Sequence, residues 1–175
     1  MEIIYLAGNS LNNKTWIEKV KSEFDHFSSG TILGYDHWTN GNKFIDFETE
    51  SKKLAELVKD KEGYYIFAKS AGSILALKTI YEKTVFPQKI ILCGHPYLSA
   101  KEVRLPIDDY LRSLSIPTIF IQNELDPLYS FSQLEEKLKE LSPKNYRVIK
   151  NPNNNTHDYE DFTKLVDLAK SFFVI

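Results

Sequence analysis

The segment YYIFAKSAGSILAL, residues 64–77, decides the fold, because a first apolar run ends at a serine flanked by small residues and a second run begins at once. Tyr64–Ala68 has the length and apolarity of a buried strand, whereas from Ile74 onward apolar side chains recur at helical spacing. Small residues two positions before and after Ser70 allow such a turn to pack closely. The segment therefore predicts a sharp strand-to-helix turn with Ser70 at its apex.

Short apolar runs alternate with helical patterns along the whole chain. Six runs are expected to form strands: Ile3–Leu6, Thr31–Tyr35, Tyr64–Ala68, Lys89–Cys93, Pro117–Gln122 and Tyr146–Ile149. Each run is too short for a buried helix, so the pattern favours a parallel sheet covered by helices on both faces. In the long connection from Gly94 to Ile116, only a short helix around Asp108–Leu114 is expected. The predicted fold class is α/β, a doubly wound three-layer α/β/α sandwich that forms a single domain over residues 1–175.

The residues that follow each expected strand are the candidates for chemistry, because ligands of doubly wound sheets bind beyond the carboxyl ends of the strands. These positions hold a serine, several acids and three histidines. A serine attacks efficiently only when a base takes its proton and an acid orients that base. We therefore expect Ser70 to be a nucleophile. A helix-capping role for Ser70 is the alternative, and Ser10 is the rival nucleophile.

Ser70 on its turn, Asp126 after a later strand and His157 after the last strand resemble the α/β-hydrolase superfamily, in the chain order serine, acid, histidine. The resemblance spans essentially the whole chain and is greatest to small, lidless serine hydrolases with six core strands. It implies a minimal α/β-hydrolase fold and a serine hydrolase that cleaves an ester, thioester or amide bond through an acyl-enzyme intermediate. In that reading His157 is the base, Asp126 holds its imidazole, and neither a metal nor a cofactor is required.

The stretch YLAGNS, residues 5–10, is similar to the oxyanion-hole segment of that superfamily. The resemblance therefore implies that the backbone amides of Asn9 and Ala71 stabilise the oxyanion. Two positions depart from the pattern: Ala68 stands where the turn has its first glycine, and Ala7 replaces a frequent histidine. A non-catalytic binding or scaffold protein with the same fold stays open, as does an acyltransferase that uses the same triad.

Other side chains at the same edge of the sheet compete for these roles or extend the site. The rival acids are Glu124, Asp158 and Asp36, and the rival bases are His37 and His95. The side chains expected to contact substrate are Ser10, His37, Trp38, Lys69, His95 and Tyr97. The alternatives are packing for the aromatic side chains and simple solvation for Lys69.

The composition excludes several classes of partner. A formal net charge of −2 and a pI near 6.1 give no electrostatic reason to bind nucleic acid or an anionic membrane. The sequence has no cysteine pair, no His-Glu-x-x-His helix and no glycine-rich phosphate loop. The lone Cys93 lies in an apolar run, and the N-terminus shows neither a signal peptide nor a membrane span. We expect a soluble, cytoplasmic protein whose partner is a small-molecule acyl substrate.

Overall fold

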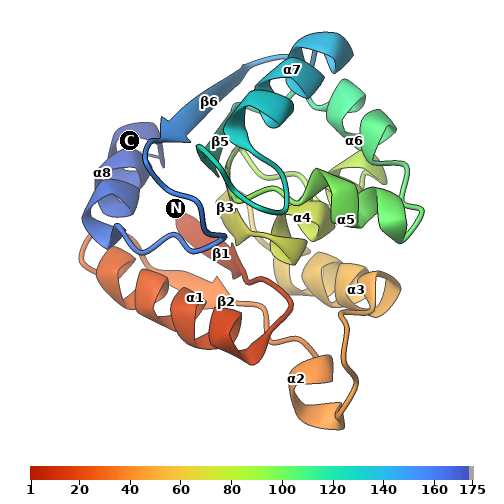
Figure 1. The fold of residues 1–175 in the computed structure, drawn as a ribbon. Helices are drawn as coiled ribbons and strands as arrows, with labels where there is room; N and C mark the ends of the chain where they lie inside the picture. The colour runs from red at the N-terminus through yellow and green to blue at the C-terminus, as the bar shows by residue number, and fades with distance from the viewer. Residues whose placement is uncertain (174–175) are drawn as a thin grey trace.

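A six-stranded, all-parallel sheet forms the centre of the computed structural model, which describes residues 1–173 (Figure 1). The strands are β1 (Glu2–Leu6), β2 (Gly30–Ile32), β3 (Tyr64–Lys69), β4 (Lys89–Cys93), β5 (Thr118–Asn123) and β6 (Tyr146–Asn151). They lie in the order β2-β1-β3-β4-β5-β6. The chain thus moves from β1 outward to β2, returns past β1 to β3, and then continues stepwise to β6. The order reverses between β1 and β3, where doubly wound sheets bind their ligands.

Helices cover both faces of the sheet. They are α1 (Leu11–Phe24), α2 (His37–Asn40), α3 (Phe47–Val58), α4 (Ala71–Tyr81), α5 (Tyr97–Glu102), α6 (Ile107–Ser113), α7 (Phe131–Leu141) and α8 (Phe162–Phe173). Figure 1 shows α1 beside α8 on one face, with α3, α4, α6 and α7 on the other. The predicted α/β class and the three-layer α/β/α sandwich are therefore confirmed.

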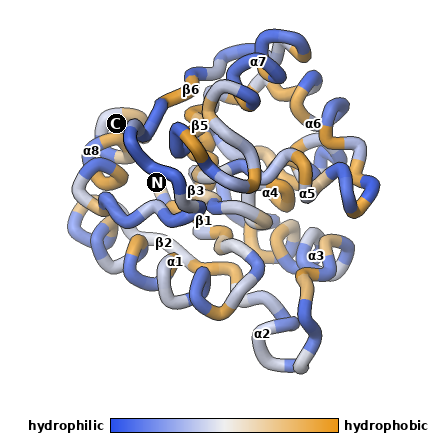
Figure 2. The backbone as a smooth tube through the Cα atoms, viewed as in Figure 1, coloured by the Kyte–Doolittle hydropathy of each residue, from blue (hydrophilic) through white to orange (hydrophobic). Residues whose placement is uncertain are grey.

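The core is built from the apolar strands and one stripe of each helix. In Figure 2 the central strands and α4 are largely hydrophobic, whereas the segment after β6 is hydrophilic. On the α1 face, the ring of Phe24 packs edge-on against Phe67 of β3, with 5.1 Å between the ring centroids. Tyr5 of β1 approaches the same Phe24 ring at 5.9 Å. These aromatic contacts fix α1 against the strands that carry the candidate site.

The helices and strands differ from expectation mainly at the ends of the sheet. Strand β2 covers Gly30–Ile32 rather than Thr31–Tyr35, because the chain leaves the sheet once the Leu33 amide has donated to the Tyr5 carbonyl at 3.0 Å. The helices α2 and α5 have four and six residues, too few for a periodic pattern to reveal them.

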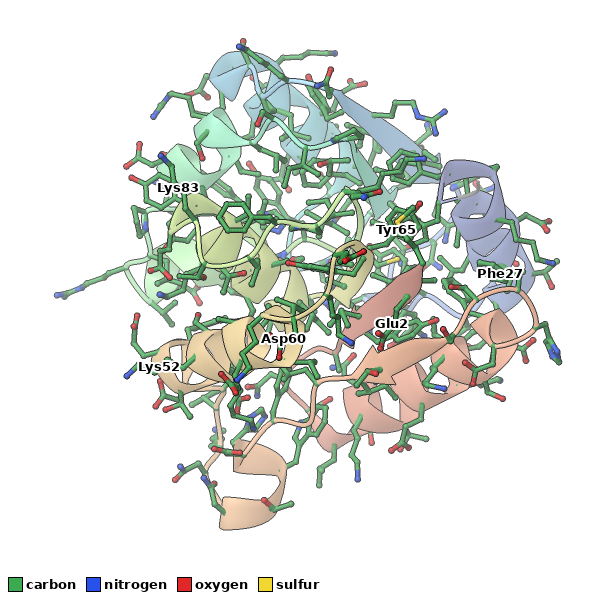
Figure 3. All side chains as sticks on the ribbon, turned by 180° about the vertical axis from the view of Figure 1, so that it is seen from behind. Glu2, Phe27, Lys52, Asp60, Tyr65 and Lys83 are labelled. Carbon is green, nitrogen blue, oxygen red and sulfur yellow. The ribbon has the colours of Figure 1, made fainter. Side chains whose placement is uncertain are left out.

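Figure 3 views the molecule from behind, at the amino edge of the sheet, where Glu2 and Tyr65 lie. Tyr65 stacks face to face on Phe173 of α8, with 4.7 Å between centroids. The Glu2 carboxylate forms an ion pair with Lys61 at 2.6 Å. These contacts lie at the amino ends of the strands, and the candidate chemistry lies at the opposite, carboxyl ends. Within residues 1–173, no helix combines the length and apolarity needed to cross a membrane.

Candidate active site

Ser70 occupies a strained backbone position between the end of β3 and the first residue of α4. Its φ of 52° and ψ of −121° lie outside the regions that a serine normally adopts. The Ser70 amide donates to the Cys93 carbonyl at 2.9 Å, and its carbonyl accepts hydrogen bonds from the amide and the hydroxyl of Ser73 at 2.8 and 2.6 Å. Its own hydroxyl makes no hydrogen bond with any described residue. This geometry matches the sharp turn that the sequence predicts.

Gly72 allows the first turn of α4 to rest directly on the end of β1. A Cβ atom at this position would lie 2.6 Å from the carbonyl oxygen of Ala7 and closer still to that of Leu6, which no side chain tolerates. The contact brings the amide of Ala71 to the segment that carries Asn9. Among residues 1–173, the backbone amides of Asn9 and Ala71 have no recorded acceptor, so both remain available to a ligand.

Asp126 and His157 form a hydrogen-bonded pair at the same edge of the sheet. The Nδ1 atom of His157 lies 2.8 Å from Oδ2 and 3.0 Å from Oδ1 of the fully buried Asp126 carboxylate. Because an ionised carboxylate only accepts, this partner assigns a ring N–H to Nδ1, so Nε2 is the basic nitrogen of the neutral tautomer. Nε2 is buried and has no hydrogen-bond partner among the described residues. The pair therefore presents a basic nitrogen that is free to take a proton.

Tyr159 and Leu128 complete the environment of the Asp126 carboxylate. The Tyr159 hydroxyl donates to Oδ2 at 2.8 Å, and the Leu128 amide donates to Oδ1 at 2.9 Å. The hydroxyl also accepts from the Asn123 amide at 3.0 Å. Burial and the negative charge of Asp126 raise the pKa of Tyr159 far above its usual value, so this group stays a donor at neutral pH. Sequence reasoning missed Tyr159, because nothing in the pattern ties it to the acid.

The Asn123 side chain fixes the segment that carries His157. Its amide nitrogen donates to the carbonyls of Thr156 and Asp158, both at 2.8 Å, and so holds the chain on either side of the imidazole. Its oxygen accepts from the Asn151 side chain at 2.8 Å. Asn123 is completely buried, so these hydrogen bonds are shielded from water. The Asn123 side chain therefore holds the His157 segment against the end of β5.

Gly94 connects the strained turn to the His157 segment. It follows Cys93, which accepts the Ser70 amide, and it has a positive φ of 58°. A Cβ on Gly94 would lie 2.9 Å from Cε1 of His157 and 2.7 Å from the Tyr159 ring. The His157 imidazole therefore packs against Gly94. Gly94 is the neighbour in sequence of Cys93, whose carbonyl accepts the Ser70 amide. In Figure 1 the blue segment after β6 crosses the end of the sheet before α8 begins. No hydrogen bond joins Ser70 to His157 in this structure, and such bonds often form only with substrate bound.

His37 and Trp38 point their polar atoms at the candidate oxyanion segment. His37 Nε2 lies 2.6 Å from the Asn9 carbonyl oxygen, and Trp38 Nε1 donates to the same oxygen at 3.2 Å. The Asn9 side chain in turn accepts from the Ile45 amide at 2.8 Å and donates to the Lys43 carbonyl at 3.0 Å. The two aromatic side chains, expected to contact substrate, are thus seen to hold the Asn9 segment in place.

His95 and Tyr97 are engaged within the protein. The His95 side chain is completely buried, and its Nδ1 lies 2.9 Å from the Ser73 hydroxyl. Burial lowers the pKa of His95 to about 3, so the ring is neutral. This burial corrects the expectation that His95 lines a substrate pocket or acts as a rival base. Tyr97 is 6% exposed, and its hydroxyl donates to Asp108 at 2.6 Å, which leaves it a packing residue.

The rival acids are committed to other partners or exposed. Glu124 accepts from Lys150 at 2.9 Å, and Asp36 accepts from Lys53 at 2.5 Å. Asp158 is exposed and has no ion pair with a described residue. Of the four acids, Asp126 alone bonds the His157 ring within the described chain.

A groove of about 690 Å³ opens beside His157, between α1 and the segment that leads into α8. Its lining residues are Ser10, Asn12, Asn13, Thr15, Trp16, Lys19, Lys69, His157, Asp158, Glu160 and Phe162. Ser10 caps α1, because its hydroxyl accepts from the Asn13 amide at 3.3 Å. Lys69 is only 4% exposed, which corrects the alternative that it is a solvated lysine. Within residues 1–173, no group of three or more His, Cys, Asp or Glu side chains is arranged to hold a metal ion.

Solved structures of hydrolases share this arrangement of strands and helices. Est1E from Butyrivibrio proteoclasticus, solved with ferulic acid, is 11% identical and superimposes with a TM-score of 0.75 over 98% of this chain and 87% of its own. CarC, a serine hydrolase involved in carbazole degradation, is 12% identical and gives a TM-score of 0.76 over 99% and 90%. The chain has the α/β-hydrolase fold. At these identities the likeness shows the fold alone.

Two further comparisons reach only part of longer proteins. An uncharacterised Bacillus cereus ATCC 10987 protein is 21% identical, with a TM-score of 0.74 over 98% of this chain and 59% of its own. A UDP-N-acetylmuramate–L-alanine ligase from Borreliella afzelii (strain PKo) is 28% identical over 155 residues, which covers 78% of this chain and 31% of the ligase. The chain thus spans about a third of the ligase and less than two thirds of the Bacillus protein. No protein-family model matches the chain.

Proposed function

We propose that this chain is a serine hydrolase of the α/β-hydrolase superfamily that cleaves an ester, thioester or amide bond. The observation that carries the proposal is the hydrogen-bonded pair of His157 with the buried Asp126 carboxylate. Its Nε2 has no partner among the described residues and lies at the same end of the sheet as the strained turn of Ser70. CarC, which has the same fold, is a serine hydrolase, and this supports hydrolysis as the reaction. We further propose that the substrate is a small acyl compound and that the reaction takes place in the cytoplasm, without nucleic acid or membrane as partner.

In the proposed mechanism the Ser70 hydroxyl oxygen attacks the substrate carbonyl carbon while His157 Nε2 accepts its proton. Asp126 keeps the imidazole oriented and stabilises the positive charge that forms on it. The protonated His157 then gives its proton to the leaving group, and an acyl ester on Ser70 remains. Water, deprotonated by the same Nε2, attacks that ester and releases the carboxylic acid and free Ser70.

The developing oxyanion is stabilised by backbone amides in this proposal. The amides of Asn9 and Ala71 lack acceptors among the described residues, and the contact of Gly72 with β1 holds α4 against the Asn9 segment. Removing one such donor typically lowers the rate by about 100- to 1,000-fold. These donors belong to the backbone, so side chains can only position them. His37 and Trp38 do so for the Asn9 amide through their hydrogen bonds to the Asn9 carbonyl.

Two other functions share the fold. An acyltransferase would use the same residues and replace water by another acceptor. A scaffold protein would have the same fold and catalyse no reaction. We do not propose a ligase activity from the match to the Borreliella ligase. That match covers 31% of the ligase, and this sequence has no glycine-rich phosphate loop.

The test is labelling with a fluorophosphonate probe, followed by peptide mass spectrometry. One adduct on the Ser70 peptide is expected at neutral pH, and Ser70→Ala should abolish it. His157→Ala should slow labelling by at least 100-fold, whereas Ser10→Ala, the rival serine, should leave the adduct in place. Absence of an adduct on folded protein would overturn the proposal in favour of a scaffold. Product analysis with added alcohols and amines as acceptors separates a hydrolase from an acyltransferase.

A further inference from the structure

Lys69 is a buried lysine at the base of the groove beside His157. It is the last residue of β3, and its side chain points to the α1 face, where Nζ lies 2.6 Å from the Asn13 side-chain oxygen and 5.0 Å from the centroid of the Trp16 ring. Asn13 is held in turn by its bond to the Ser10 hydroxyl at 2.9 Å. The ammonium is therefore fixed in position while it still borders the open groove.

The Lys69 ammonium has no carboxylate partner within 4 Å among the described residues. Within residues 1–173 the ammonium makes one hydrogen bond, to the oxygen of the neutral Asn13 amide, which uses one of its three N–H donors. Burial lowers the pKa of Lys69, and the more distant carboxylates of Asp158, Asp126 and Glu160 oppose this shift. A buried cation without a counter-ion is costly, so its retention requires an explanation.

Lys78 shows how this chain treats its other deeply buried lysine. Lys78 is 2% exposed, and its ammonium pairs with two carboxylates, Glu48 at 2.9 Å and Glu82 at a shorter distance. Lys69 is almost equally buried, at 4%, but it lies against a groove instead of against two acids. The difference indicates that the missing counter-ion of Lys69 arrives from outside the chain.

The acids of the groove do not fill that role. Asp158 and Glu160 line the groove and are exposed, so water and salt screen their charges. Lys69 lies deep and is screened far less. The base of the groove is therefore positive while its rim is negative, and a carboxylate that reaches the base meets two free N–H donors.

We propose that Lys69 is the anchor for a carboxylate on the substrate, so that this hydrolase acts on esters that carry a second, anionic carboxyl group. The inference rests on the proposed function, because it assigns the groove beside His157 to part of the substrate. The Trp16 and Phe162 side chains give the groove apolar walls, which fit a short carbon chain between the ester and the carboxylate.

A hydrolysis assay with charge-matched esters tests this specificity. The para-nitrophenyl hemiglutarate carries the carboxylate on the acyl side, and para-nitrophenyl valerate is its neutral match. Acetoxybenzoate and its methyl ester provide the same comparison with the carboxylate on the alcohol side. We expect kcat/KM to favour the carboxylated ester of one pair by about 10- to 100-fold, as a charge-assisted hydrogen bond provides. Lys69→Met should reduce that ratio to about 1, because the charge that distinguishes the carboxylated ester from its neutral match is gone.

Lys14→Met is the matched control, because Lys14 lies on α1 outside the groove and is 47% exposed. It removes the same charge and should leave the ratio unchanged. Lys69→Gln is the second variant if Lys69→Met is poorly folded by circular dichroism. An equal loss for charged and neutral esters in either variant would overturn the anchor, because it would assign Lys69 to the reaction itself. Equal rates for charged and neutral esters in the unmutated protein would overturn it as well.

A binding arm separates failure of the anchor from failure of the proposed hydrolase. In Ser70→Ala protein, the tryptophan fluorescence, to which Trp16 in the groove wall contributes, is titrated with monomethyl glutarate and with dimethyl glutarate as the neutral match. Saturable binding of the monoester that weakens at least tenfold in Ser70→Ala/Lys69→Met supports the anchor even when no ester is hydrolysed. Absence of saturable binding at millimolar ligand overturns it, even when fluorophosphonate labelling has established Ser70 as the nucleophile.

Discussion

Replacing Tyr159 by Phe removes a single oxygen from the network around the candidate acid. That oxygen donates to Asp126 Oδ2 at 2.8 Å and accepts from the Asn123 amide at 3.0 Å. Tyr159 is 2% exposed and Asn123 is fully buried, so water cannot replace either bond without rearrangement. The ring itself, which packs edge-on against His157 at 6.1 Å between centroids, is kept by the substitution.

The expected loss of stability follows from these two bonds. A hydrogen bond to an ionised group contributes about 1.5–3 kcal/mol, and a buried amide left without an acceptor costs about 1–3 kcal/mol. Asp126 keeps its bonds from Leu128 and His157, which limits the damage. We therefore expect Tyr159→Phe to lower the free energy of unfolding by about 3 kcal/mol.

Urea unfolding followed by circular dichroism measures this change, with Tyr5→Phe as the matched control. Tyr5 is fully buried like Tyr159, but its hydroxyl has no hydrogen-bond partner among residues 1–173. Removing an unpaired buried hydroxyl should leave stability unchanged or raise it by up to about 1 kcal/mol. The two substitutions delete the same atom, but only Tyr159→Phe is expected to lower the free energy of unfolding. A Tyr159→Phe protein within about 0.5 kcal/mol of the parent, or an equal loss in both variants, would refute the reasoning.

Three further predictions concern the same edge of the sheet. Asp126→Asn should lower kcat by about 10,000-fold with an unchanged circular dichroism spectrum, because the wrong His157 tautomer forms; a loss below tenfold would contradict this role. Gly94→Ala places a Cβ 2.9 Å from the His157 ring at a positive φ, so it should destabilise by about 1–3 kcal/mol and slow fluorophosphonate labelling; unchanged labelling would argue against the contact. Burial lowers the pKa of His95 to about 3, so below pH 6.5 the unfolded chain binds a proton that the folded protein does not. Stability should therefore fall as pH drops from about 6.5 toward 3, by up to about 1.4 kcal/mol per pH unit. In His95→Gln, urea unfolding between pH 7 and pH 4 should show a shallower fall, and an unchanged slope would count against a neutral buried ring.

The fold was predictable from the sequence because its signals are local and strong. The runs that became β3 and β4 are apolar except for one lysine at an end of each, as buried parallel strands require, and Gly72 marks where α4 touches β1. The weak points were short elements. Strand β2 has three residues and α2 has four, so neither shows a period, and both are set by contacts with the Asn9 segment and β1.

The sequence predicted the residues of the candidate site better than the contacts that hold them in place. Chain order and strand ends were enough to select Asp126 and His157, which the structure brings within hydrogen-bond distance. The side chains that hold them, Asn123 and Tyr159, carry no pattern of their own, because their roles depend on partners about 30 residues away. The burial of individual side chains was also not predictable from the sequence. The sequence left Lys69 either as a substrate contact or as a solvated lysine, and the packing of α1 against β3, which buries it, is not visible in the sequence.

Trapping the acyl group on the protein tests the central claim, that His157 activates Ser70 for covalent attack. The protein is mixed with para-nitrophenyl acetate, quenched in acid within the first turnover and digested with trypsin for peptide mass spectrometry. Trypsin cleaves after Lys69, so an acetyl group on Ser70 and one on the Lys69 amine, which would block that cleavage, give different peptides. We expect acetyl on Ser70, a burst of nitrophenol equal to the enzyme concentration, and loss of both in Ser70→Ala and His157→Ala. Acetyl on Lys69, or steady hydrolysis with no acyl group on Ser70, would contradict the activation of Ser70 by His157.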